Sequence, residues 1–206
     1  MTTTETRPTR RSPADKYDDR RRALASSALR TLGELGYARA SLREIAQNSE
    51  FTHGVVHYYF SDKLDLIVYG VRQYKETCVH RYDGVVAEAT SADELRDTFA
   101  AKLVETIVDE APMHRLWYDL RSQAMFEESL REAVLMIDKT LEAMIWRVVL
   151  RYAELGGRDP SVAPATAYAL LDGLFQQALL GHTCGRAEAL DELIAQVREL
   201  MPRLVA

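Results

Sequence analysis

The chain has 206 residues, of which 47% are hydrophobic, so it is long enough for one or two small domains that each bury a core. Its net charge of -5 is unevenly spread: residues 1–75 hold 13 Lys and Arg against 9 Asp and Glu, whereas the remaining residues hold 13 against 22. This acidic total excludes a uniformly basic nucleic-acid binder but leaves a basic head on an acidic body. No apolar run approaches the ~20 residues of a membrane span, and the polar N-terminus does not resemble a signal peptide, so we expect a cytoplasmic protein with no membrane partner.

Helical signals begin after a polar N-terminal segment. Residues 1–17 lack hydrophobic periodicity and carry several arginines, which predicts a flexible tail or, alternatively, an arm that follows a DNA groove. The acidic residues Asp18 and Asp19 favour a helix N-terminus. An apolar stripe that includes Leu24 and Leu32 then predicts a helix to Leu35, ended by Gly36.

Two short helices are predicted next, separated by about four residues. Ser41 and Glu44 have the spacing of a capping box, which opens a helix to about Gln47. Thr52 can cap a second helix over 53–59, and Ser61 can cap a longer one that runs toward His80. Two short helices at this spacing are typical of a helix-turn-helix.

The rest of the chain also has helical periodicity and no alternating strand pattern. Ser91 and Glu94 form a second capping-box pattern, and Pro112 is expected to break the helix that follows. We predict the remaining helices over 113–126, 128–155, 161–183 and 188–201. The fold class is therefore all-α, with about nine helices: a tail over 1–17, a three-helix helix-turn-helix domain over 18–66, and a helical body over 67–206.

One motif resembles the DNA-binding region of TetR-family transcriptional regulators. It consists of Thr52-x-Gly54-x-Val56-x-x-Tyr59-Phe60-x-x-Lys63-x-x-Leu66, placed after Leu42-x-x-Ile45-Ala46. In that family the helix that begins near Thr52 enters the major groove, and the lysine that opens the next helix contacts a phosphate. The resemblance implies a homodimer that binds a near-palindromic double-stranded DNA operator.

The same stretch divides into core and surface by helical spacing. Val56 and Phe60 share one face and should be core. We expect DNA contacts from the side chains on the other faces and on the preceding helix: Ser41, Arg43, Thr52, His53, Gly54, His57, Tyr58, Tyr59 and Lys63. The chain departs from the family pattern at Glu50 and Phe51, where Gly and a small aliphatic residue are usual, and at His57, where Tyr is usual.

Metal binding is the alternative role for the two histidines. His53 and His57 lie four apart, as zinc ligands on a helix do. No third ligand and no His-Glu-x-x-His pattern accompanies them, so we expect no metal and no cofactor. No catalytic motif is present either, and we expect no enzyme activity.

For the body, the resemblance implies a dimer interface on the last two helices and a pocket for a small-molecule effector whose binding releases DNA. The interface candidates are Leu170, Leu174, Leu193, Val197 and Leu200, and the alternative for each of them is a place in the core of the chain itself. The pocket candidates are Phe99, His114, Trp117, Tyr118, Met125, Phe126, Met144, Trp146, Phe175 and Gln176.

These pocket candidates favour a largely apolar or aromatic effector, although Tyr, Trp and Met side chains can also surround a quaternary ammonium. The sequence thus predicts a DNA-binding repressor released by an effector. A regulator without an effector, and an all-helical enzyme or interaction module, stay open as alternatives.

Overall fold

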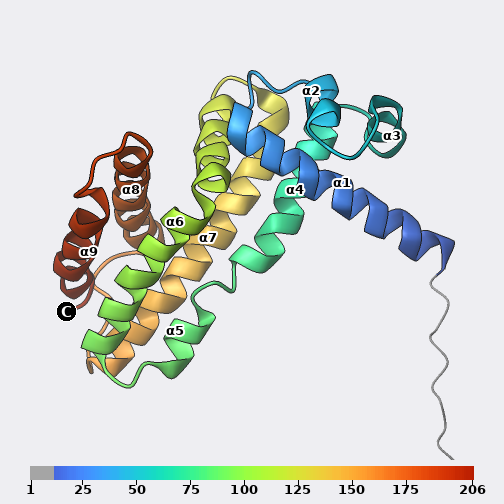
Figure 1. Cartoon of the computed structure of the whole chain (residues 1–206). Coiled ribbons are helices and arrows are strands. Elements are labelled where there is room, and N and C mark those ends of the chain that lie inside the picture. The colour runs from blue at the N-terminus through green and yellow to red at the C-terminus, as the bar shows by residue number, and fades with distance from the viewer. Residues whose placement is uncertain (1–11) are drawn as a thin grey trace, which may run out of the picture.

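The computed structural model describes residues 12–206, which form helices joined by short connections (Figure 1). The N-terminal part, called the head, contains α1 (Pro13–Leu35), α2 (Leu42–Gln47), α3 (His53–Tyr59) and α4 (Lys63–Cys78). The body contains α5 (Asp83–Glu88), α6 (Ala92–Ala124), α7 (Glu128–Leu155), α8 (Pro164–Thr183), α9 (Ala189–Leu200) and the 3-10 turn η1 (Met201–Leu204). Within residues 12–206 there is no strand beyond one isolated bridge between Pro160 and Val205, so the predicted all-α class is confirmed.

The first helix begins earlier than the sequence predicted. Ser12 caps it by accepting from the Asp15 amide, while the Asp15 carboxylate accepts from the Ser12 amide, and Pro13 occupies the first helical position. The prediction that residues up to 17 form a tail is therefore wrong for residues 13–17, and residues 1–11 lie outside the described part of the chain. The other end matches the prediction, because Gly36 ends α1 at a positive φ of 83°.

Side-chain caps place the short helices of the head. The predicted capping box of Ser41 and Glu44 is confirmed, and Thr52 caps α3 through the Val55 amide. The prediction for α4 is wrong in its capping residue: the Asp65 amide donates to the Asp62 carboxylate at 2.8 Å, so Asp62 takes the position expected of Ser61.

The predicted break at Pro112 is a kink inside one long helix. The backbone leaves helical geometry at Glu110 (φ -130°, ψ 25°), two residues before Pro112, and α6 then resumes to Ala124. Proline lacks the amide hydrogen that the helix ladder requires, which explains the bend at this point. The short helix α5 was not predicted.

The packing of the head explains how it accommodates Glu50 and Phe51, the two residues that depart from the family pattern at the helix-turn-helix. Val56 and Phe60 are buried as predicted, and Phe51 is buried with them. The Arg20 guanidinium lies 4.6 Å from the centre of the Phe51 ring. No non-glycine residue in the described chain has a positive φ, so Glu50 carries no backbone strain.

The head and the body share one continuous hydrophobic core. Helix α1 packs against α4 on one side and α6 on the other, while α6, α7, α8 and α9 pack together as the body. In Figure 1 the C-terminal end of α1 lies beside the upper ends of α6 and α7. No helix in the described residues is both long and apolar enough to cross a membrane.

Helices α1 and α6 approach closely where Gly33 faces Pro112. A Cβ on Gly33 would lie 2.9 Å from the Pro112 carbonyl oxygen and 3.1 Å from its Cβ, and the backbone there cannot move away as a flexible side chain would. Glycine at this position therefore sets how closely the head docks on the body.

We expect Gly33→Ala to lower the free energy of unfolding by about 1–3 kcal/mol, because the added methyl group overpacks the α1–α6 contact. Gly84→Ala is the matched control, since a Cβ there meets only the Glu88 carboxylate at 4.0 Å. Urea unfolding followed by circular dichroism measures both. Equal midpoints for the two variants would show that the contact tolerates the methyl group.

Candidate functional sites

Helix α3 presents a polar, exposed face that includes four of the nine predicted DNA contacts. His53, Gly54 and His57 are exposed, and Tyr58 has 71% of its surface accessible. The rings of His53 and His57 lie 4.5 Å apart. A Cβ on Gly54 would have no neighbour within 4 Å, so this part of the helix surface is open to a close approach. The arrangement suits a helix that lies in a DNA groove.

Tyr59, also predicted as a contact, is half-buried and packs its ring 4.7 Å from Tyr17 on α1. Thr52 and Ser41 cap α3 and α2, so their side-chain oxygens already accept from backbone amides. Arg43 is exposed on α2 but does not line the groove described next.

A surface groove of about 460 Å³ lies between the connection after α1, the exposed face of α3 and the start of α4. It brings together Ser41, His57 and Lys63 from the predicted set, and adds Arg39. Arg39 was missed because it stands outside the recognised motif. Cationic and hydrogen-bonding groups around a groove beside the recognition helix are what a DNA phosphate requires.

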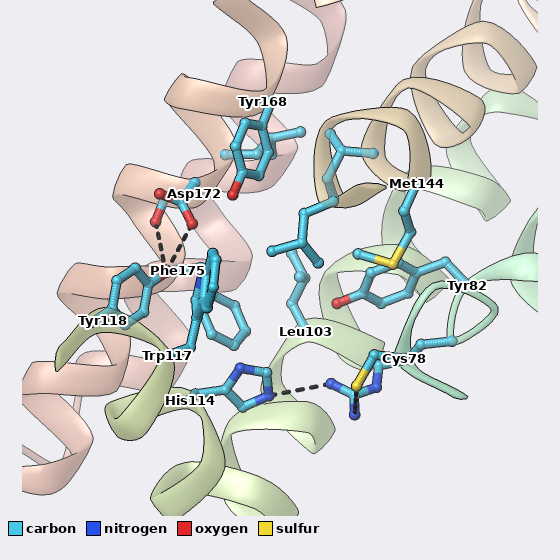
Figure 2. A pocket seen from close by; sticks show the side chains of 14 residues that line it. Cys78, Tyr82, Leu103, His114, Trp117, Tyr118, Met144, Tyr168, Asp172 and Phe175 are labelled. Carbon is cyan, nitrogen blue, oxygen red and sulfur yellow. Dashed lines mark hydrogen bonds between the residues drawn. The ribbon is translucent and has the colours of Figure 1, made fainter. Parts of the chain in front are cut away.

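The body contains a partly open cavity of about 60 Å³ between the end of α4 and helices α6, α7 and α8 (Figure 2). Five of the ten predicted effector residues line it: His114, Trp117, Tyr118, Met144 and Phe175. The lining residues that the sequence analysis missed are Cys78, Arg81, Tyr82, Leu103, Leu141, Ile145, Tyr168, Leu171 and Asp172.

The other five predicted effector residues lie elsewhere. Phe99 is buried in the core against Tyr82, with ring centres 5.0 Å apart, and Trp146 is half-buried against the same core. Met125 and Phe126 are 69% and 83% exposed at the corner between α6 and α7. Gln176 is exposed and lines, with Met125, a neighbouring surface groove of about 490 Å³.

One end of the cavity carries a hydrogen-bonded acidic group. Tyr118 donates to the Asp172 carboxylate at 2.9 Å, and Arg121 binds the same carboxylate at 2.6 Å. Arg121 also lies 3.7 Å from Asp138, which accepts from Tyr168 at 2.7 Å. Of these charged groups only Asp172 lines the cavity, whereas Arg121 and Asp138 line the neighbouring surface groove that also includes Asp172. Burial, together with Asp172, raises the pKa of the Tyr118 hydroxyl well above its usual range, so Tyr118 stays neutral and donates.

The opposite end carries donors. Arg81 approaches the Nε2 of His114 at 3.1 Å and forms an ion pair with Glu110 at 2.6 Å, and Tyr74 also donates to Glu110. Arginine can only donate, so His114 accepts through Nε2 and its proton resides on Nδ1. Figure 2 shows this contact below the aromatic walls formed by Trp117 and Phe175. Arg81 and Asp172 were missed because isolated charges on helical segments resemble solvated surface positions.

The predicted dimer-interface residues separate into two groups. Leu193 and Val197 are fully buried within the chain, so their assignment to an interface is wrong. Leu170 is 44% exposed, and Leu174 and Leu200 are half-buried. These three border a groove of about 220 Å³ across α8 and α9, together with Gln196, Glu199 and Arg203.

Comparison with known proteins agrees with this architecture. Residues 24–69 match the family model "Bacterial regulatory proteins, tetR family", and residues 91–205 match "BetI-type transcriptional repressor, C-terminal". The chain belongs to the TetR family. It is accordingly a DNA-binding transcriptional regulator and not an enzyme.

Similar curated proteins include "HTH-type transcriptional regulator BetI" of several Burkholderia species. The Burkholderia mallei protein is 27% identical over 165 residues, which span 78% of this TetR-family chain and 82% of the relative. The Burkholderia thailandensis protein is 32% identical over 117 residues, or 54% of this chain, and the match spans only 58% of that relative.

Solved TetR-family structures share the fold at low sequence identity. A Haloarcula marismortui regulator has a TM-score of 0.72 at 20% identity, and the alignment covers 92% of this chain and 100% of that one. A Saccharomonospora viridis regulator, solved in complex with choline, has a TM-score of 0.69 at 15% identity, with 91% and 98% covered. Bacillus subtilis FadR in complex with stearoyl-CoA has 0.68 at 18%, with 87% and 96% covered.

Arg39→Ala should weaken binding to operator and random duplexes by similar factors, because a phosphate contact carries no sequence information. The slope of log affinity against log salt should fall by about 0.9, the value for one lost phosphate contact. Arg72→Ala removes an equally exposed arginine on α4, outside the groove. Fluorescence anisotropy at several salt concentrations measures both, and identical slopes for the two variants would exclude Arg39 from the interface.

Proposed function

We propose that this TetR-family regulator is a homodimeric repressor, which binds a near-palindromic operator and releases it when a small molecule occupies the body cavity. The observation that carries the proposal is the cavity itself, which is partly open, is lined by aromatic side chains and has Asp172 and Arg81 among its polar lining residues. An exposed α3 and a cationic groove in the same chain supply the DNA-binding half.

The cavity chemistry supports a small quaternary ammonium as the effector class. The Asp172 carboxylate lines the cavity and attracts a cation, with Arg121 and Asp138 just outside the lining, and Trp117 and Phe175 contribute aromatic rings to the walls. The Saccharomonospora viridis neighbour is described in complex with choline, a ligand of this class. The apolar lining predicted from the sequence contributes the remaining walls.

The cavity size supports a compact ligand. A single water needs only roughly 10–15 Å³ of cavity, so the space of about 60 Å³ suits a compact group such as tetramethylammonium. Any larger ligand requires side chains to move, and Met144 is the adaptable member of the lining.

The homodimer supports operator binding because a two-fold protein matches a two-fold site. We place the interface on α8 and α9 around Leu170, Leu174 and Leu200, which keep apolar surface exposed in the single chain. An effector that prefers the dimer conformation with wrongly spaced heads would lower operator affinity by its differential affinity for the two conformations, and by no more.

DNA from upstream of the protein's own gene tests the repressor half. We expect binding to this duplex to resist competition by random DNA and to weaken on addition of choline. Equal binding to both duplexes would exclude a specific operator in this DNA, whereas specific binding that choline leaves unchanged would favour a regulator without this effector.

Asp172→Asn should raise the choline dissociation constant by about tenfold, because it removes one charge at the negative end while keeping an acceptor for Tyr118. Isothermal titration of the purified dimer measures the change. 3,3-Dimethylbutan-1-ol, which has the shape of choline without its charge, should bind poorly to wild type. Asp191→Asn on the exposed surface of α9 is the matched control. Equal choline affinity in both variants would place the cation elsewhere.

A further inference from the structure

We propose that Tyr37 is a positioning residue that holds Lys63 ready for DNA phosphate through its ring and carbonyl, and connects it to the effector cavity through its hydroxyl and amide. Tyr37 lies in the connection between α1 and α2 and is 9% exposed. The second half of the proposal rests on the effector response proposed above, whereas the first half depends only on DNA binding.

On the side of the DNA groove, Tyr37 fixes the lysine by two contacts. The Lys63 ammonium donates to the Tyr37 carbonyl oxygen at 2.7 Å and lies 3.9 Å from the centre of the Tyr37 ring. Lys63 also lines the groove that contains Arg39 and His57. An ammonium has three donors, so the hydrogen bond to Tyr37 leaves the others available for a phosphate. Tyr37 therefore orients the Lys63 ammonium while N–H donors remain available for a phosphate.

On the side of the body, Tyr37 is bound by two acids from the region where α6 and α7 meet. Its amide donates to Asp119 on α6 at 2.6 Å, and its hydroxyl donates to Glu127, the residue before α7, at 2.7 Å. Burial and the Glu127 hydrogen bond raise the pKa of the Tyr37 hydroxyl beyond its usual range, so the group remains a donor at neutral pH.

The same two acids act on the lysine. Burial lowers the pKa of Lys63 below its usual value, and the charges of Glu127, Asp119 and Glu44 offset only part of this shift. Residues of the body thus contribute directly to the electrostatic environment of a side chain in the DNA groove.

The part of α6 after the kink joins this cluster to the cavity. Within it, Trp117 and Tyr118 line the cavity, whereas the next residue, Asp119, binds Tyr37. Arg115, adjacent to the cavity residue His114, donates to the Gly33 carbonyl on α1 at 3.2 Å. Neighbouring positions of a helix project in different directions, so one helical segment touches the ligand site and the head at once. A shift of this segment must change the position of Tyr37.

Two substitutions separate the roles of Tyr37. Tyr37→Phe removes the hydroxyl and its bond to Glu127 but keeps the ring beneath Lys63. Tyr37→Leu removes both. Because each keeps a large apolar side chain, the core around the connection stays filled, and thermal unfolding identifies any variant that fails to fold.

The first experiment measures duplex binding without effector in a double-mutant cycle of Tyr37→Leu and Lys63→Ala. We expect Tyr37→Leu to weaken binding about threefold to tenfold when Lys63 is present, from the size of a cation–ring contact, and to have little effect in the Lys63→Ala background. Tyr37→Phe should bind like wild type. A merely structural tyrosine would give additive effects, and that result overturns the positioning role.

The second experiment uses choline as the probe and compares operator affinity with and without it. In Tyr37→Phe, choline should bind as tightly as in wild type, measured by tryptophan fluorescence, yet weaken operator binding by a smaller factor. Tyr69→Phe is the matched control, because its ring packs on Phe60 within the head at 5.6 Å. An unchanged factor in Tyr37→Phe overturns the connection to the cavity. If the wild-type protein binds no choline, both the proposed effector class and the proposed connection between Tyr37 and the cavity are overturned. The double-mutant cycle still tests whether Tyr37 positions Lys63.

Discussion

The bend in α6 is the constraint on which the arrangement of the molecule depends. Pro112 supplies no amide hydrogen, and the helix leaves regular geometry at Glu110 just before it. The bend turns the second part of α6 toward α1, where Gly33 allows the backbones to touch. It also places the Glu110 carboxylate where Arg81 binds it. A straight helix could not serve the body core, the cavity and the head contact together.

Charge is used differently in the two halves. In the head, Arg20 and Lys63 lie over aromatic rings, which holds the cations in place while leaving hydrogen-bond donors for other partners. In the body, charges meet across helices at the two ends of the cavity, through Asp172 with Arg121 and Glu110 with Arg81. Each pair is partly buried, with side chains 14–37% exposed, so desolvation offsets part of its attraction and its net contribution to stability is small.

The helices of the head could be predicted well, because helical spacing and capping patterns depend on residues that are near one another in the sequence. The burial of Val56 and Phe60 follows from helical spacing, and the capping box of Ser41 and Glu44 follows from its sequence pattern. The capping-box pattern also occurs at Ser12 and Asp15 and marks the start of α1. It was overlooked because the surrounding residues are polar.

The body was harder to predict because its outcome depends on which helix lies opposite which. Leu193 and Val197 form an apolar stripe that suits either a partner subunit or the chain's own core, and packing of α9 against α6 and α8 decides for the core. Trp117 and Phe126 are both aromatic and near in sequence, yet one lines the cavity and the other is exposed, because α6 ends between them. Periodicity gives the face of a helix but not its neighbour.

The contacts of Lys63 also determine whether a change in the body strengthens or weakens DNA binding by the head. A lysine held by Tyr37 loses part of its conformational freedom before DNA arrives, so phosphate binding costs less entropy than it would for a free side chain. Glu127 and Asp119 favour the charged form of the lysine, which burial alone would disfavour. A shift of the body that moves the Tyr37 ring and carbonyl away from Lys63 should therefore weaken DNA binding, and this is the sign that an effector-released repressor requires. Glu127 and Asp119 repel phosphate at long range, but they bind Tyr37, which orients Lys63 for DNA.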